Sequence, residues 1–165
     1  MTITYIKGDA TKPVVNPINL NYYNDNHNDN QLIIHICNNI GKWGLGFVLA
    51  LSKRWKEPEM MYKSLNQYQL GTTQFVKIPN TNITVANMIA QNGINNKYSK
   101  KICRVDYEGL KKCLQQVNSY VLENKCSIHM PKIGTGLAYG DWSIIENLIK
   151  NTIDNNINVY VYLID

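Results

Sequence analysis

Two hydrophobic periods alternate along the chain, and each change of period marks a predicted element. Short apolar runs bounded by Gly, Pro, Asn or Asp predict strands, whereas apolar residues spaced three and four apart predict helices. The predicted strands are 2–6, 32–37, 73–78, 83–90, 126–130 and 158–164. The predicted helices are 47–55, one from Pro58 that closes at Gly71, one from an N-cap at Asp106 to about Asn124, and 142–153.

The predicted strand 32–37 decides the fold class. It is apolar except for His35, which is typical of a strand buried on both faces of a sheet. Strands and helices alternate without an internal repeat or a domain linker. We therefore expect residues 1–165 to form a single α/β domain with a mixed, largely buried sheet and helices on both faces. Residues 16–31 are polar and predict a surface loop.

The interior of the predicted helices follows from their apolar spacing. In the second helix, the inner face is expected to carry Met61, Leu65 and Tyr68. In the long third helix, five apolar residues recur at helical spacing and predict its buried side. They are Leu110, Cys113, Leu114, Val117 and Val121.

Composition excludes several classes of protein. The 165 residues fit one domain, and no apolar run is long enough to span a membrane. The N-terminal residues lack the basic and apolar regions of a secretory signal, so a cytoplasmic protein is expected. The four cysteines form no C-x-x-C pair and, with the three histidines, no zinc pattern. We expect free thiols, no metal, no cofactor and, without a coiled coil, a monomer.

The net charge of +5 suits an anionic ligand, although the basic residues are spread along the chain. The longest basic cluster runs from Lys97 to Arg104 and is interrupted by Tyr98 and three other uncharged residues. Such a cluster is more typical of a solvated loop than of a nucleic-acid patch.

Two glycine-rich loops follow two of the predicted strands and lead into helices. They are G-K-W-G-L-G over residues 41–46 and G-T-G-L-A-Y-G over residues 134–140. Ligands of open α/β sheets bind beyond the carboxyl ends of strands, where glycine lets the backbone approach closely. Exposed N–H groups at such loops and helix N-termini bind phosphates. Neither loop has the spacing of a P-loop or a dinucleotide fingerprint, so the alternative that the glycines serve only tight turns stays open.

Four segments together resemble the macrodomains, an ADP-ribose-binding family. I-T-Y-I-K-G-D at 3–9 resembles the opening strand, and H-I-C-N at 35–38 followed by G-x-W-G-x-G at 41–46 resembles the catalytic loop. M-P-K-I-G-T-G-L-A at 130–138 with G-D-W at 140–142 resembles the phosphate loop, and V-Y-V-Y at 159–162 resembles the closing strand. The first loop is most similar to the branch that holds ADP-ribose 1''-phosphate phosphatases and the terminal ADP-ribose protein glycohydrolase. The resemblance implies a three-layer α/β/α fold.

The resemblance also implies how the ligand is held. Asp9 would accept a hydrogen bond from the adenine 6-amino group, and Asn38 would bind the hydroxyls of the distal ribose. Backbone N–H groups of the second loop would hold the diphosphate, with Tyr139 as a shield. The ligand-binding residues implied in this way are Gly8, Asp9, Asn38, Gly41, Trp43, Gly44, Gly46, Gly134, Thr135, Gly136, Leu137, Ala138 and Tyr139.

The catalytic chemistry departs from part of the family pattern. In the glycohydrolase relative, a lysine attacks the sugar and an aspartate follows G-x-G-L, but the matching residues here are Gln91 and Ala138. Neither can act as a nucleophile or a general base, which disfavours a lysine-dependent mechanism. His35 matches the histidine of the phosphatase relative, and its ordinary pKa near 6.5 suits proton transfer. His35 is therefore the candidate catalytic residue, and the alternative is a histidine that only forms hydrogen bonds within the sheet.

Three functions remain in view. The first is a metal-independent hydrolase acting on ADP-ribose 1''-phosphate or a related derivative, such as an ADP-ribosyl linkage or an O-acyl-ADP-ribose. The second is a non-catalytic ADP-ribose-binding module, which Gln91 and Ala138 favour. The third is a nucleic-acid-binding domain, against which the lack of aromatic residues interleaved with basic ones argues. An ADP-ribosylated protein or nucleic acid is a candidate partner, and a membrane is not.

Overall fold

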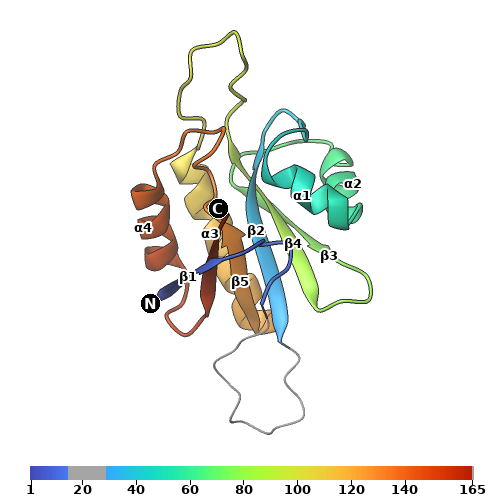
Figure 1. Ribbon diagram of the computed structural model, residues 1–165, viewed down its shortest axis with the longest axis vertical. Coiled ribbons are helices and arrows are strands. Elements are labelled where there is room, and N and C mark those ends of the chain that lie inside the picture. The colour runs from blue at the N-terminus through green and yellow to red at the C-terminus, as the bar shows by residue number, and fades with distance from the viewer. Residues whose placement is uncertain (15–28, 165) are drawn as a thin grey trace, which may run out of the picture.

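The computed structural model describes residues 1–14 and 29–164, and its elements follow the predicted order (Figure 1). The strands in the described part are β1 (Ile3–Lys7), β2 (Asn30–Asn38), β3 (Thr72–Lys77), β4 (Ile83–Gln91), β5 (Cys126–Pro131) and β6 (Val159–Leu163). The helices there are α1 (Phe47–Arg54), α2 (Glu57–Lys63), α3 (Tyr107–Asn124) and α4 (Trp142–Thr152).

The strands form one mixed sheet in the order β1-β6-β5-β2-β4-β3. Every pair of neighbours is parallel except β3 and β4, which are antiparallel at the edge. β2 lies near the centre, and its residues Leu32, Ile33 and Ile34 are fully buried. The prediction of a mixed, largely buried sheet is confirmed.

Helices cover both faces of this sheet and give three layers (Figure 1). α3 and α4 pack together on one side, and α2 contacts β3 and β4 on the other. Successive residues of β2 enter two separate cores, because side chains alternate along a strand. Leu32 and Ile34 belong to the core beneath α3 and α4, whereas Ile33 belongs to the core beneath α1 and α2. The predicted α/β/α class is therefore confirmed.

The two long helices begin where the sequence predicts. Asp141 caps α4, and its carboxylate accepts a hydrogen bond from the backbone N of Ser143 at 2.9 Å. Asp106 occupies the N-cap position of α3 but makes no capping hydrogen bond through its side chain. The five residues predicted for the inner face of α3 are all buried.

The second helix is shorter than predicted, and it buries a different face. α2 ends at Lys63, and Leu65 and Tyr68 follow outside the helix. Pro58 and Tyr62 are buried, whereas Met61 is 45% exposed. The prediction for Met61 was wrong because the consecutive apolar residues 60–62 fit helical spacing in more than one register.

The prediction for residues 16–31 is tested only at its end. Residues 15–28, including His27, lie outside the described residues. Asn30 and Gln31 were placed in the polar loop, but they begin β2 and pair with β5. This end of the prediction was wrong because ladder hydrogen bonds from a neighbouring strand override a polar composition.

Candidate functional site

The two glycine-rich loops lie at one edge of the sheet. β2 and β5 are parallel neighbours, and each ends where its loop begins, at Asn38 and at Pro131. The first loop leads into α1 and the second leads into α4. Carboxyl ends of adjacent parallel strands share one edge, so the loops lie against each other there.

The side chain of Asn38 holds the first loop in shape. Its Oδ1 accepts hydrogen bonds from the backbone N of Ile40 at 3.1 Å and of Lys42 at 3.0 Å. The hydroxyl of Tyr62 donates between the carbonyl of Asn38 at 2.7 Å and the same Oδ1 at 2.9 Å, and Nδ2 donates to the carbonyl of Lys42 at 2.7 Å. Asn38 therefore builds the loop, and the second hydrogen of its Nδ2 is left for a ligand.

The second loop is closed by contacts between its own glycines. Gly134 has a φ of 75°, and its carbonyl accepts a hydrogen bond from the backbone N of Gly140 at 2.7 Å. A Cβ at Gly140 would lie 2.5 Å from that carbonyl oxygen, so no other residue fits this turn. Around Gly136, in contrast, no atom of the described residues other than its chain neighbours lies within 4 Å of where a Cβ would stand. The outer side of the loop is therefore open.

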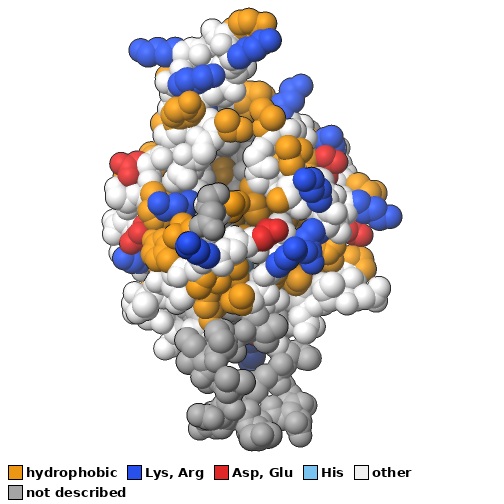
Figure 2. Space-filling view, in the orientation of Figure 1, with side chains coloured by type: hydrophobic (Ala, Val, Ile, Leu, Met, Phe, Trp, Pro, Cys, Tyr) orange, Lys and Arg blue, Asp and Glu red, His pale blue; other side chains and the backbone are white. Residues whose placement is uncertain are grey.

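Three adjoining cavities follow the loops and form one cleft. We name them the Asn38 cavity, of about 480 Å³, the middle cavity, of about 280 Å³, and the Asp9 cavity, of about 710 Å³. The first two share Ile36, Leu45 and Leu137, and the last two share Gly46 and Phe47. Figure 2 shows hydrophobic side chains gathered across the middle of one face of the molecule, with Lys and Arg side chains around them.

The Asp9 cavity is mostly apolar and has one carboxylate at its edge. Phe47, Leu163 and Pro131 are among its lining residues. Oδ1 of Asp9 accepts hydrogen bonds from the backbone N and the hydroxyl of Thr11, both at 2.8 Å. Burial raises the pKa of this carboxyl, but the bonds from Thr11 and the nearby cations outweigh burial and hold the pKa below its ordinary value. Asp9 is therefore ionised at neutral pH.

The Asn38 cavity carries cations and amides. Lys42 and Lys63 line it together with Gln91 and Asn95. Among the described residues that line this cavity there is no carboxylate and no imidazole. The cavity is therefore suited to a group that is negatively charged or rich in hydroxyls.

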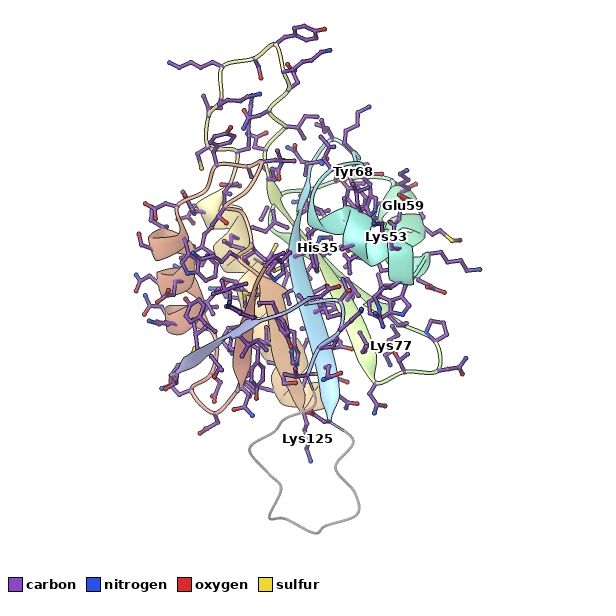
Figure 3. All side chains as sticks on the ribbon, viewed as in Figure 1. His35, Lys53, Glu59, Tyr68, Lys77 and Lys125 are labelled. Carbon is purple, nitrogen blue, oxygen red and sulfur yellow. The ribbon has the colours of Figure 1, made fainter. Side chains whose placement is uncertain are left out.

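His35 lies in the interior of the sheet, on β2 (Figure 3). Its side chain packs edge-on against the ring of Trp43, at 5.4 Å between centroids, and borders the middle cavity. Its Nε2 lies 2.6 Å from Oδ1 of Asn87, whose Nδ2 donates to the carbonyl of Pro58 at 3.1 Å. Asn87 Oδ1 is thus an acceptor, and the proton of the imidazole is on Nε2. Burial lowers the pKa of His35 to about 4, so the ring is neutral at neutral pH.

Most of the predicted site residues line the cleft. Trp43 lines the Asn38 cavity, but most of its side chain is buried in the core. There its Nε1 donates to the hydroxyl of Ser52 at 2.9 Å. Tyr139 is half exposed and lines none of the three cavities. The predicted residues that line the cleft are Gly8, Asp9, His35, Asn38, Gly41, Trp43, Gly44, Gly46, Gly134, Thr135, Gly136, Leu137 and Ala138.

Sequence reasoning missed several residues that line the cleft, and three of them show why. Phe47 lies between the middle and Asp9 cavities, and its place directly after the first loop was a usable signal. Lys63 and Asn95 reach the Asn38 cavity from distant parts of the chain. Their sequence neighbours carry no signal for this site, because only the fold brings them to it.

Two general properties concern the described residues alone. No group of three or more His, Cys, Asp or Glu side chains in residues 1–14 and 29–164 is placed to hold a metal ion. Within the same ranges, no helix has both the length and the apolar character that crossing a membrane requires. The monomeric state and the cytoplasmic location stay predictions.

Comparison with known proteins identifies relatives over nearly the whole chain, although no family model matches. A protein of unknown function from Bacteroides thetaiotaomicron is 43% identical, with a TM-score of 0.84 and 98% of each chain covered. An ADP-ribose 1''-phosphate phosphatase of Candida albicans is 25% identical over 137 residues, which cover 79% of this chain and 86% of the relative.

A macrodomain protein from Streptomyces coelicolor is 37% identical, with a TM-score of 0.77, and the match covers 98% of this chain and 99% of that one. Identity at this level over nearly the full length of both chains accompanies the three-layer fold and the two glycine-rich loops already described. This chain belongs to the macrodomain family.

Proposed function

We propose that the cleft binds ADP-ribose, with adenine in the Asp9 cavity, the diphosphate over the middle cavity and the distal ribose in the Asn38 cavity. The continuity of the three cavities carries this proposal, because each offers what one part of that ligand needs. The family and the similarity to an ADP-ribose 1''-phosphate phosphatase support it.

At the adenine end, Phe47 and Leu163 supply apolar surface for the base. Both hydrogen bonds from Thr11 go to Oδ1 of Asp9, so Oδ2 is the oxygen that would accept from the 6-amino group. An ionised carboxylate makes a stronger hydrogen bond than a neutral acceptor does. Asp9 would therefore select adenine over a base that carries a carbonyl at the same position.

At the diphosphate, backbone N–H groups supply the positive charge. α1 begins after Gly46, which has no side chain to cap the helix, so the first N–H groups of α1 are left for an anion. The second loop lines the same cavity through Gly134, Thr135 and Gly136. The two loops would hold the diphosphate between them.

At the distal end, we propose hydrolysis of a 1''-linked derivative, foremost the 1''-phosphate. Lys42 and Lys63 would stabilise the charge of a phosphate there, and phosphoryl transfer depends mainly on positioning and charge. His35 stays a candidate catalytic residue with a narrower role. Because its proton is on Nε2 and directed at Asn87, Nδ1 can accept a proton but not donate one, and the thiol of Cys37 lies 4.0 Å from Nδ1.

A non-catalytic binding module is the second candidate, and one observation favours it. Among the described residues, the side chains that line the Asn38 cavity include no imidazole and no carboxylate to act as a general acid or base. Cys37 is there, but burial raises the pKa of its thiol well above the ordinary value.

The binding proposal is tested by calorimetric titration of wild type and Asp9→Asn with two ligands. These are ADP-ribose and the analogue in which hypoxanthine replaces adenine. Asn keeps Oδ1 for Thr11 but puts a donor where Oδ2 was, so affinity for ADP-ribose should fall about tenfold. The variant should gain relative preference for the hypoxanthine analogue, whose O6 accepts a hydrogen bond. Equal affinities of both proteins for both ligands would refute the assignment of Asp9.

Turnover is tested by measuring free phosphate released from ADP-ribose 1''-phosphate, with His35→Gln beside wild type. Gln retains a donor toward Asn87, which makes it a milder change than Ala in a buried site. Release by wild type supports the hydrolase, and its loss in a variant that still binds ADP-ribose supports His35 as the base. Binding without release by wild type would leave the non-catalytic module.

A further inference from the structure

Residues 92–104, the larger part of the segment between β4 and α3, project from one end of the molecule (Figure 1). We call them the 92–104 projection. Its cations are Lys97, Lys100, Lys101 and Arg104, and its sequence contains no Asp or Glu. Figure 2 shows basic and hydrophobic side chains on its visible face, without an acidic one.

Hydrogen bonds of two asparagines hold the projection in one shape. Nδ2 of Asn95 donates to the carbonyl of Ile102 at 2.8 Å, and Oδ1 accepts from the backbone N of Ile102 at 3.2 Å, which ties its two sides together. At the tip, Oδ1 of Asn96 accepts from the backbone N of Tyr98 at 2.8 Å and of Ser99 at 3.0 Å. The basic side chains are therefore presented by an ordered backbone, which reduces the entropy lost when a partner binds.

The base of the projection is joined to the cleft. The backbone N of Arg104 donates to the carbonyl of Ala138 at 2.7 Å, and Nδ2 of Asn95 donates to the carbonyl of Leu137 at 3.1 Å. Ile94 and Asn95 also line the Asn38 cavity. A partner that lies along the projection would thus reach the distal end of the cleft.

The tip combines an aromatic ring with cations. Tyr98 is 86% exposed, and Nζ of Lys97 lies 4.9 Å from the centre of its ring. Lys100 and Lys101 are exposed beside it. Exposed aromatic rings stack with nucleic-acid bases, and lysines neutralise the phosphates between them. An acidic polypeptide would use the cations alone and would leave the ring in water.

We propose that the 92–104 projection docks single-stranded nucleic acid, with a base on Tyr98 and phosphates on the neighbouring lysines. The strand then extends toward the Asn38 cavity. Docking itself does not depend on the proposed function. The further step, that the strand carries the ADP-ribosyl group which enters the cleft, rests on the proposed function.

The sequence pattern favoured a solvated loop over a nucleic-acid patch for this cluster, whereas its position in the structure favours the patch. A single tyrosine in the sequence is a weak sign of base stacking. Here that tyrosine stands at the exposed tip of an ordered projection that borders a ligand-sized cleft. Position, rather than composition, makes it a docking surface.

The test is fluorescence anisotropy with a short labelled single-stranded oligonucleotide across a series of salt concentrations. The projection variant is Lys97→Glu/Lys100→Glu/Lys101→Glu. The matched control is Lys77→Glu/Lys111→Glu/Lys125→Glu, whose Lys77 and Lys125 lie away from the projection (Figure 3). Each triple variant replaces three positive charges by three negative ones, which takes the net charge from +5 to −1.

The projection variant should bind the oligonucleotide at least about tenfold more weakly than the control, and the salt dependence should fall by about 2 in a log–log plot. Tyr98→Ala should weaken binding about fivefold or more. Equal losses in the two triple variants would overturn the proposal, since net charge alone would then explain binding. So would the absence of binding by wild type, or displacement by polyglutamate together with an inert Tyr98→Ala.

Calorimetry with ADP-ribose separates this proposal from the proposed function. The projection variant should keep the wild-type affinity for ADP-ribose while it loses the oligonucleotide. If wild type binds the oligonucleotide but not ADP-ribose, the proposed function fails and the docking surface stands. If it binds only ADP-ribose, the docking surface fails and the proposed function stands.

Discussion

Two buried histidines should make the folded state sensitive to mild acid. Besides His35, His129 on β5 is fully buried, with Nδ1 2.8 Å from the hydroxyl of Tyr162 and Nε2 2.8 Å from the hydroxyl of Ser127. The Tyr162 oxygen already accepts from the backbone N of Val14 at 2.9 Å, so its own proton is directed to Nδ1 of His129. Protonation of His129 would place a proton on Nδ1, which would then face the hydroxyl proton of Tyr162. It would also bury an unpaired charge.

The magnitude follows from the two pKa values. Burial lowers the pKa of His35 and of His129 to about 4 each, against an ordinary value of 6.5. Between these values the unfolded chain binds more protons than the folded one. The stability is therefore fully present above pH 6.5 and falls as the pH drops toward 4. From pH 8 to pH 5 each histidine should lower the free energy of unfolding by about 2 kcal/mol, and the pair by about 4 kcal/mol.

Urea unfolding at pH 8 and pH 5 measures this loss, and the window stops above the range in which the carboxylates titrate. His35→Gln and His129→Gln should each reduce the pH-dependent loss from about 4 to about 2 kcal/mol, whatever they cost at pH 8. The difference between the two pH values is thus read separately from any packing defect. A single variant that keeps the full loss, or a wild type with equal stability at both pH values, would refute the reasoning.

Three further predictions concern the walls of the cleft. Gly140→Ala should lower the free energy of unfolding by about 1–3 kcal/mol in urea titration, because its Cβ would collide with the Gly134 carbonyl. Gly136→Ala should leave that free energy unchanged or raise it by up to about 1 kcal/mol. In calorimetry, however, it should lower ADP-ribose affinity about tenfold, since the methyl group enters the middle cavity. Tyr62→Phe should cost about 1–2 kcal/mol in urea titration, because Asn38 loses a buried donor.

The sequence was a reliable guide wherever one physical signal dominated. The order of the elements was predictable because the apolar runs, the helical spacing in α3 and the cap at Asp141 are all local features. The buried face of the second helix was not predictable, because Met60, Met61 and Tyr62 are all apolar. Only contact with the sheet decides that Tyr62, whose hydroxyl bonds to Asn38, is the one buried.

The site was predictable to the extent that it is made of backbone. The glycine spacing predicted both loops, because glycine adopts the φ of 74° at Gly41 and of 75° at Gly134 without the strain that a side chain would bring. Side-chain roles were harder to predict, because the sequence does not say whether a polar group faces the ligand or the fold. Asn38 uses most of its hydrogen-bonding capacity on its own loop, and Asp9 uses one of its two carboxylate oxygens on Thr11.

The use of polar side chains to hold the loops, rather than to contact a ligand, bears on catalysis. The neutral imidazole of His35 and the amide of Asn38, which line the cleft, hydrogen-bond to the protein itself. What remains to meet a ligand at the distal end is chiefly the ammonium groups of Lys42 and Lys63, because the other side-chain amides of this cavity also donate to backbone carbonyls. Ammonium groups attract an anion and stabilise its charge. If the chain turns over a 1''-phosphate, the barrier must be lowered mainly by electrostatic stabilisation. The rate between pH 5 and pH 8 should then follow only the ionisation of the substrate's phosphate, whose second pKa is about 6. A second inflection in that range would point to a protonic group of the protein and would refute this account.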